Sequence, residues 1–185
     1  MTPPLLTLEP LTKAAFAPFG TVIETEGAPR LPINQGTTTR FDALAAIDTA
    51  HDGGSPIISL FRGARRPNPI AIRLLERHPL GSQAFYPLVD AEWLVVVATG
   101  NADDMVPDFT NLRCFLASGT QGVSYARGTW HHPLLVLLPR HDFLVVDRAA
   151  PHDEAQGQNL DEAWFDGPEG IAALIHETRL SSPTK

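Results

Sequence analysis

The chain has 185 residues, a net charge of −7 at pH 7 and 43% hydrophobic residues. These values predict one compact globular domain over residues 1–185 rather than a disordered chain. The acidic balance argues against binding to nucleic acid or to an anionic membrane surface, because both attract basic proteins.

The cysteine count and the N-terminal sequence bear on the cellular compartment of the protein. The sequence contains a single cysteine, Cys114, so no intramolecular disulfide can form, as is usual in a reducing compartment. The N-terminus has no basic start followed by a long apolar run, and runs such as Leu94–Ala98 are too short to span a bilayer as a helix. We therefore expect a cytoplasmic protein that does not enter a membrane.

The first part of the chain predicts few regular elements. Thr12–Phe19 is typical of a short helix, with its first residue as N-cap and Gly20 as its stop. Thr21–Glu24 follows as a strand. The polar, turn-rich segment Leu31–Thr39 predicts a loop, and Phe41–Ile47 is compatible with a strand or a helix.

From Pro56 onward, short apolar segments separated by glycine or proline predict strands. These strands are expected at Ile57–Phe61, Ile70–His78, Trp93–Ala98, Leu112–Leu116, Gly122–Tyr125, His131–Leu138 and Phe143–Asp147. Leu160–Phe165 predicts a brief helix, and Ile171–Ile175 is either a strand or a short helix. The pattern indicates a mainly β fold, an antiparallel sandwich, jelly-roll or barrel with a few short helices.

Alternation along Ile70–His78 places two polar side chains in the predicted interior. Side chains on a strand alternate between faces, so the apolar first, third and fifth residues share a face with Glu76 and His78. A buried carboxylate and imidazole are costly unless they are paired, hydrogen-bonded or metal-bound, which favours a functional site. A helix over the same segment would instead leave Glu76 as a solvated surface charge.

The spacing of these residues predicts which side chains converge. Glu76-x-His78-x4-Gln83 has the spacing of the metal motif of cupin barrels, which usually reads His-x-His-x4-Glu. Gly128-Thr-Trp-His131 fits the end of the second cupin motif. Glu76, His78, Gln83 and His131 would then lie together as ligands of a divalent metal, or the carboxylate and the two histidines would act as acid–base groups without one.

The other histidines and the cysteine carry a weaker signal. His131 and His132 are neighbours, so on a strand only one can face an interior site, and the motif spacing favours His131. Cys114 is expected to be a buried, inert thiol. Surface or loop positions are expected for the remaining histidines, His51, His141, His152 and His176.

Two long segments carry a family resemblance. Glu76-Arg-His-Pro-Leu-Gly-Ser-Gln-Ala-Phe-Tyr-Pro-Leu88 and Gln121-Gly-Val-Ser-Tyr-Ala-Arg-Gly-Thr-Trp-His-His-Pro-Leu134 resemble the two central signatures of the ureidoglycolate lyase family. Weaker matches lie at Phe16–Gly20, Ile33–Gly36 with Arg40, Phe61-Arg62, Phe143–Arg148 and Asn159–Glu162. The resemblance covers nearly the whole chain in the same order.

This resemblance implies a cupin-like β-barrel, usually a homodimer, that cleaves (S)-ureidoglycolate to glyoxylate and urea in allantoin degradation. It also implies a divalent metal, with nickel among those described for the family. The resemblance alone favours a lyase over an amidohydrolase that would release ammonia and carbon dioxide. Two other functions stay open: another metal-dependent cupin enzyme, such as a dioxygenase or sugar isomerase, and a non-catalytic barrel that binds a ureide or glyoxylate.

Cleavage of this substrate needs a base for the hydroxyl proton, an acid for the departing urea nitrogen and a group that holds the carboxylate. We expect His78 or Glu76 as base and His131 as acid, or these groups as metal ligands. Gln83 would orient the substrate or ligate the metal. The substrate-binding candidates are two arginines for the carboxylate, two hydroxyl donors and an amide for the urea group, namely Arg40 or Arg62, Ser82 and Tyr125, and Asn34.

Overall fold

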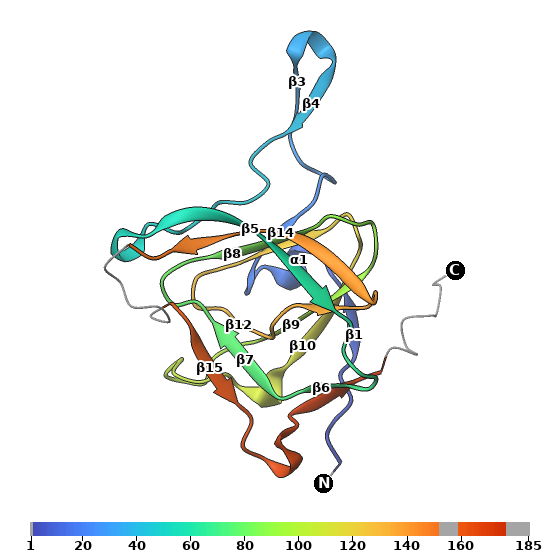
Figure 1. The fold of residues 1–185 in the computed structure, drawn as a ribbon, viewed down its shortest axis with the longest axis vertical. Helices are drawn as coiled ribbons and strands as arrows, with labels where there is room; N and C mark the ends of the chain where they lie inside the picture. Colours follow the sequence, from blue (N-terminus) through green and yellow to red (C-terminus); the bar gives the residue numbers. More distant parts are fainter. Residues whose placement is uncertain (1, 152–158, 177–185) are drawn as a thin grey trace.

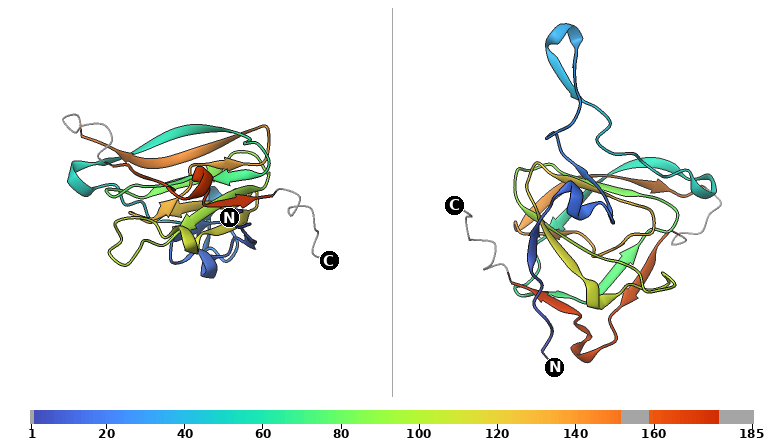
Figure 2. Two further views of the ribbon diagram at one scale, coloured as in Figure 1. Left: turned by 90° about the horizontal axis from the view of Figure 1, so that it is seen from below. Right: turned by 180° about the vertical axis from the view of Figure 1, so that it is seen from behind.

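The computed structural model describes residues 2–151 and 159–176. Two mostly antiparallel sheets face each other and enclose the main core (Figures 1 and 2). The first sheet has the order β1 (Leu8–Pro10), β10 (Arg113–Ala117), β9 (Trp93–Ala98), β12 (Trp130–His131), β7 (Leu74–Arg77) and β15 (Asp161–Trp164), with β13 (Leu135–Val136) also paired to β9.

The second sheet lies across from the first. Its order is β2 (Gly20–Ile23), β11 (Gly122–Tyr125), β8 (Gln83–Pro87), β14 (Arg140–Ala149) and β5 (Ser55–Ala64). Two separate pairs are β6 (Ile70–Ile72) with β16 (Ala173–Ile175), and β3 (Arg30–Ile33) with β4 (Thr38–Phe41). The helices are α1 (Lys13–Phe16) and the 3₁₀ turns η1 (Asn34–Gly36), η2 (His51–Gly53), η3 (Phe109–Asn111) and η4 (Pro168–Gly170).

The predicted mainly β, antiparallel, barrel-like fold with a few short helices is confirmed. The strands at Trp93–Ala98 and Gly122–Tyr125 have the predicted bounds. The helix near the N-terminus is capped as expected, because the Thr12 hydroxyl accepts a hydrogen bond from the Ala15 backbone N–H at 3.2 Å. No helix in the described ranges is long and apolar enough to cross a membrane.

Two element predictions are wrong. The segment expected as a helix at Leu160–Phe165 contains strand β15, which pairs with β7 through the register Asp161↔Arg77. The segment expected as a loop at Leu31–Thr39 belongs to the β3–β4 hairpin, which projects from the barrel as an arm (Figure 1). In both cases pairing with another strand supplies backbone partners that a local sequence pattern does not reveal.

The strand predicted over Ile70–His78 is divided at Arg73. Before this residue the chain pairs with β16, and after it the chain pairs with β12 and β15. The change of partner also changes which residues face inward. Ile70 and Ile72 pack with Leu75 in a second core, on the opposite face of the first sheet from Glu76. The prediction that Ile70 and Glu76 share a face is therefore wrong, although Glu76 does point between the sheets.

Two hydrophobic cores fix the first sheet from both sides. Alternate residues of β9 divide between them, with Val95 and Val97 in the core between the sheets and Leu94 and Val96 in the second core. The second core is closed by the β6–β16 pair and contains Leu75, whose side chain is fully buried. Packing of Leu75 therefore holds β7, and with it Glu76, against the sheet.

Leu75→Ala should lower the free energy of unfolding by about 2–5 kcal/mol, because it leaves a cavity in a close-packed core. Guanidinium-induced unfolding followed by circular dichroism measures this change. Leu88→Ala is the matched control, since Leu88 is 52% exposed, and its effect should stay within about 0.5 kcal/mol of the wild type. Equal unfolding midpoints for both variants would contradict the role of the second core.

Candidate functional site

Three of the predicted site residues converge at one end of the barrel. Glu76 lies on β7, His78 follows that strand directly, and His131 lies on β12. One ligand atom from each of these side chains lies within 4.8 Å of the other two. The register makes this possible, because His131 is the antiparallel partner of Glu76, and opposite residues project from the same face of a sheet. We call these three residues the triad.

Hydrogen bonds to backbone carbonyls orient both imidazoles of the triad. His78 Nδ1 lies 2.7 Å from the carbonyl oxygen of Asn159, and His131 Nδ1 lies 2.8 Å from that of Thr129. A carbonyl can only accept, so Nδ1 of each neutral ring carries the proton and Nε2 carries a lone pair. Both Nε2 atoms are buried without a hydrogen-bond partner among the described residues, although His131 Nε2 lies 3.6 Å from Glu76 Oε1.

Tyr125 forms one wall of the site. Its ring stacks on His131 with a centroid separation of 4.1 Å and an interplanar angle of 13°. The tyrosine is buried, and burial together with the Glu76 charge raises the pKa of its hydroxyl. Tyr125 therefore stays protonated at neutral pH and keeps His131 in place through ring packing.

The facing sheet contributes Gln83 and Asp147. Gln83 on β8 has the same parity as Phe85, and Asp147 on β14 has the same parity as Val145, so both project into the space between the sheets. Gln83 is buried and its Oε1 has no hydrogen-bond partner in the described part of the chain. The structure thus places Gln83 in the interior as predicted, but on the opposite sheet from the triad.

Burial shifts the pKa values of Glu76 and His131. Burial raises the pKa of the Glu76 carboxyl, with a smaller contribution in the same direction from Glu162, while His78 and Arg66 lower it. Burial lowers the pKa of His131 to about 3, and His78 contributes in the same direction. His131 is consequently a neutral ligand or acceptor at physiological pH, and it holds no proton at Nε2 that it could donate.

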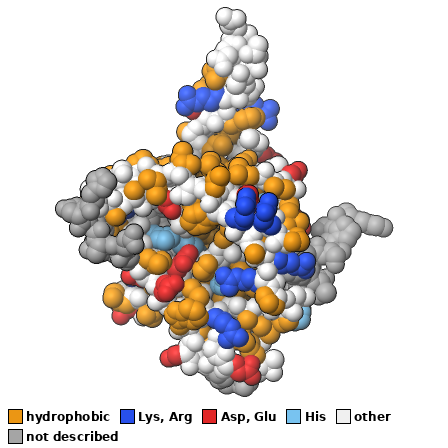
Figure 3. Space-filling view, viewed as in Figure 1, with side chains coloured by type: hydrophobic (Ala, Val, Ile, Leu, Met, Phe, Trp, Pro, Cys, Tyr) orange, Lys and Arg blue, Asp and Glu red, His pale blue; other side chains and the backbone are white. Residues whose placement is uncertain are grey.

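A cavity of about 450 Å³ opens beside Glu76. Residues from both sheets line it. Glu76 comes from the first sheet, and Phe61, Arg62 and Phe85 come from the second. On the face seen in Figure 3, histidine and acidic side chains gather between hydrophobic ones. This volume suits a ligand of a few heavy atoms that reaches the triad from one side.

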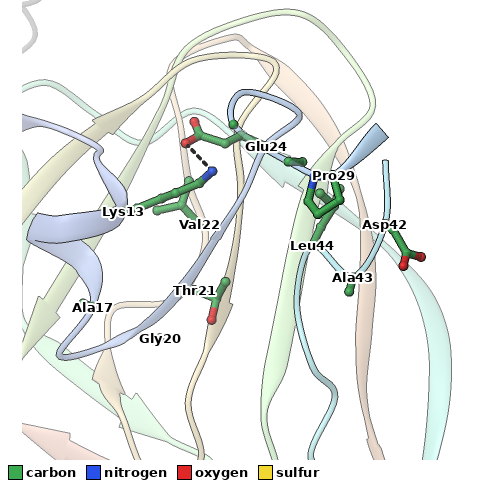
Figure 4. Close-up of a pocket in the computed structure, with 12 residues that line it drawn as sticks. Lys13, Ala17, Gly20, Thr21, Val22, Glu24, Pro29, Asp42, Ala43 and Leu44 are labelled. Carbon is green, nitrogen blue, oxygen red and sulfur yellow. Dashed lines mark ion pairs between the residues drawn. The ribbon is translucent and has the colours of Figure 1, made fainter. Parts of the chain in front are cut away.

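A second groove of about 370 Å³ lies at the base of the arm (Figure 4). Its charged groups are already satisfied, because Lys13 Nζ lies 3.4 Å from Glu24 Oε1 and 2.6 Å from the backbone oxygen of Glu26. None of the triad residues lines it. The groove therefore offers no chemistry of its own.

Several predicted substrate-binding residues are not brought to the triad. Asn34 and Arg40 lie on the exposed arm, where Arg40 forms an ion pair with Asp42 at 2.6 Å. Ser82 is buried, but its hydroxyl bonds the backbone of Asp48, accepting from N–H at 2.9 Å and donating to the carbonyl at 3.3 Å. These side chains have other partners: Asn34 bonds Thr38, Arg40 pairs with Asp42, and Ser82 bonds Asp48.

Arg62 lies near the triad but is already paired with a carboxylate. It lines the cavity, yet its guanidinium binds both oxygens of Asp142, at 2.8 and 2.7 Å. Its side chain is 60% exposed, so this pair is a solvated one that exchanges readily. A substrate carboxylate would compete with Asp142 for the same fork.

Sequence reasoning missed three residues of the site. The sequence pattern places Asp147 in a strand and in a family match, places Asn159 in a family match, and gives no role to Arg66. Asn159 orients His78 and also accepts a hydrogen bond from the Leu80 backbone N–H at 2.7 Å through its side chain. The strand parity of Asp147 with the apolar residues of β14 was the signal that could have found it.

Of the remaining histidines and the cysteine, some are buried and some are exposed. Cys114 is buried, and burial raises the pKa of its thiol to about 12, which confirms an inert thiol. His132 is buried too, with Nδ1 2.7 Å from the Pro133 carbonyl. His51 is exposed as expected, whereas the surface prediction for His141 is wrong, because it packs on Phe143 in the core. His152 lies outside the described residues.

The triad fits a divalent cation. Two imidazole nitrogens with free lone pairs and one carboxylate are a common ligand set for nickel, iron, manganese and zinc. Ligand atoms bound about 2.1 Å from one ion are at most about 4.2 Å apart, so a small contraction of the triad suffices. The carbonyls bonded to both Nδ1 atoms supply the outer contacts that metal-binding histidines normally have.

Comparison with known proteins places these residues in a family. The ureidoglycolate lyase family model matches residues 3–172. A ureidoglycolate lyase of Burkholderia mallei (strain NCTC 10229) is 55% identical over 169 residues, covering 91% of this chain and 97% of the relative. One of Pseudomonas fluorescens (strain Pf0-1) is 47% identical over 172 residues, covering 93% and 98%.

One solved structure, a dTDP sugar isomerase from Desulfovibrio desulfuricans G20, is similar with a TM-score of 0.46 and 16% identity, covering 82% of this chain and 87% of that chain. This likeness is too distant to bear on function. The family match spans both segments that build the triad and nearly all of the described barrel. The chain belongs to the ureidoglycolate lyase family.

Proposed function

We propose that this chain is a lyase that cleaves (S)-ureidoglycolate to glyoxylate and urea in allantoin degradation. The observation that carries the proposal is the convergence of Glu76, His78 and His131 beside a small cavity, in a member of the ureidoglycolate lyase family. The acidic charge and the single buried cysteine support a cytoplasmic enzyme of small-molecule metabolism.

The reaction moves one proton and breaks one bond. The hydroxyl of the substrate loses its proton and becomes the aldehyde carbonyl of glyoxylate. The adjacent carbon–nitrogen bond breaks, its electron pair stays on nitrogen, and that nitrogen gains a proton to give urea. No water is consumed, so the site must relay a proton between two atoms on the same carbon.

Glu76 is the group we assign to this proton relay. Its carboxylate faces the cavity and has two oxygens, of which Oε1 lies toward His131. A carboxylate can accept the hydroxyl proton and deliver it to the departing nitrogen. The acid role expected for His131 passes to Glu76, because burial leaves no proton on His131 Nε2 at physiological pH.

The Nε2 lone pairs of His78 and His131 would bind the reacting hydroxyl through a cation; without one, a single imidazole could accept from that hydroxyl. A divalent cation held by Glu76, His78 and His131, nickel by family resemblance, would acidify the hydroxyl. The Nδ1–H bonds to backbone carbonyls fix the orientation of both rings and leave both lone pairs free. Tyr125 closes the wall behind His131.

A positive charge at the cavity mouth would hold the substrate carboxylate. Arg62 lines the cavity and presents a guanidinium fork that matches a carboxylate. Arg66 is exposed, and its charge lowers the pKa of Glu76, so it acts on the same space. These arginines replace Arg40 as the candidates for this role within one subunit.

We also propose a homodimer. The arm carries the exposed side chains of Leu31 and Ile33, 44% and 38% exposed, and an isolated two-stranded hairpin is marginal in water without a packing partner. The outer face of β5 exposes Ile58 and Leu60 by 73% and 71%. A second copy that covers these apolar surfaces would remove both from water, and Asn34 and Arg40 would then serve at the subunit boundary.

His78→Ala should reduce urea release from (S)-ureidoglycolate by at least about 100-fold without unfolding the protein, because it removes one of the two oriented lone pairs. Coupled assays of urea and glyoxylate measure the rate, and circular dichroism checks the fold. His51→Ala is the matched control, since this exposed histidine lies outside the triad. Near-normal turnover in the His78 variant would sink the assignment.

Removal of bound metal with a chelator should abolish turnover, because the metal-free triad lacks the charge that acidifies the hydroxyl. Addition of Ni²⁺ should restore turnover. Metal analysis of the dialysed protein checks that removal is complete. Full activity of the metal-free protein would leave Glu76 and the histidines acting without a metal.

Replacing both exposed β5 residues with aspartate (Ile58→Asp with Leu60→Asp) should turn the dimer into a monomer, because two carboxylates cannot be buried in an apolar interface without partners. Light scattering after size-exclusion chromatography measures the mass. Met105→Asp is the control, because Met105 is 65% exposed on a loop outside the proposed interface. A wild-type protein of monomeric mass would refute the dimer.

A further inference from the structure

The second sheet carries two buried acceptor atoms that are not part of the triad. Gln83 Oε1 and Asp147 Oδ1 are buried, and neither has a hydrogen-bond partner among the described residues. A buried acceptor without a partner costs about 1–3 kcal/mol, so a native site rarely keeps one without a ligand to satisfy it. The two side chains come from adjacent strands, β8 and β14, whose register pairs Ala84 with Val146.

Both acceptors point toward the space in front of the triad. Their strand parity matches that of Phe85 and Val145, which lie in the core between the sheets. Gln83 is the antiparallel partner of Tyr125, whose ring stacks on His131. Burial raises the pKa of the Asp147 carboxyl, while Gln83 and His78 act in the opposite direction, as expected for near neighbours.

The Gln83 amide has a defined orientation. Its side chain hydrogen-bonds the Asp147 carboxylate, which opposes the rise in the pKa of that carboxyl caused by burial, so the amide nitrogen faces the carboxylate. The amide oxygen is therefore the atom left to accept from another donor. Gln83 Oε1 and Asp147 Oδ1 are two neighbouring acceptors that remain for a ligand.

Asp147 is not among the clustered cation ligands, and Gln83 lies on the opposite sheet from the triad. Among the described residues, the ligand atoms that cluster within 4.8 Å come from Glu76, His78 and His131. A partner for two adjacent acceptors outside a metal site must carry at least two N–H or O–H groups on the same side. The ureido end of ureidoglycolate carries an NH and an NH₂ and has this pattern.

We propose that Gln83 and Asp147 form an acceptor pair that binds the N–H groups of the ureido end of the substrate. The inference rests on the proposed function and assigns an orientation to the substrate. The ureido group lies against the second sheet, the reacting carbon lies at the triad, and the carboxylate lies toward Arg62 at the cavity mouth. Asp147 thereby becomes a residue that selects ureides over other hydroxy acids.

The test uses binding to the full-length protein rather than turnover. Oxalurate carries both a carboxylate and a ureido group and cannot undergo the reaction, whereas oxalate lacks the ureido group. Asp147→Asn replaces one acceptor oxygen by an NH₂ donor and should raise the dissociation constant of oxalurate at least about tenfold, with that of oxalate unchanged. Isothermal titration calorimetry measures both. Gln83→Met, which removes the other acceptor at similar volume, should give the same pattern.

Asp90→Asn is the matched control, because it makes the same chemical change at an exposed position between β8 and β9. Unchanged oxalurate binding in both site variants would overturn the acceptor pair. Equal weakening of oxalurate and oxalate would overturn it as well, since it would mean a general loss of site structure. If the wild type prefers oxalurate to oxalate but releases no urea from ureidoglycolate, the proposed reaction fails while the acceptor pair stands.

Discussion

The candidate site depends on the register between β7 and β12. Strand β12 has only two residues, and its pairing places His131 directly opposite Glu76 of β7 and next to Val97 of β9. A slip of one residue would exchange His131 for Trp130, which lies in the second core, and would turn the imidazole away from the carboxylate. The register is held because each face of the sheet has its own core, so neither Trp130 nor Leu75 can move to the other side without exposing a large apolar surface.

Four buried polar atoms without a hydrogen-bond partner among the described residues belong to the candidate site: Nε2 of His78 and of His131, Gln83 Oε1 and Asp147 Oδ1. Burial of polar groups without partners opposes folding, and most such groups in a native protein are hydrogen-bonded. Backbone carbonyls satisfy the other nitrogen of each imidazole, so each histidine has a single free lone pair. The site therefore has its electrostatic character before a ligand arrives, which reduces the reorganisation needed during reaction.

The arm, in contrast to the site, is exposed to solvent. The residues of β3 and β4 are almost all exposed, and Figure 1 shows the arm extending away from the barrel that holds β7 and β12. Within it, Asn34 bonds Thr38 and Arg40 pairs with Asp42. The proposed dimer would place both at a subunit boundary. The apolar outer face of β5 offers a surface of matching character.

The sequence by itself determined the β-rich class, the strands at Trp93–Ala98 and Gly122–Tyr125 and, through motif spacing, the convergence of Glu76, His78 and His131, because short apolar runs and motif spacing are local properties. The tertiary structure alone decided the rest. It divided the predicted strand at Arg73, since the chain changes strand partners there. It removed Ser82 and Arg40 from the triad, because they bond Asp48 and Asp42 instead. It added Asp147 and Asn159, because contacts between residues more than 60 positions apart depend on which strands pair, and local pattern carries no information about that pairing.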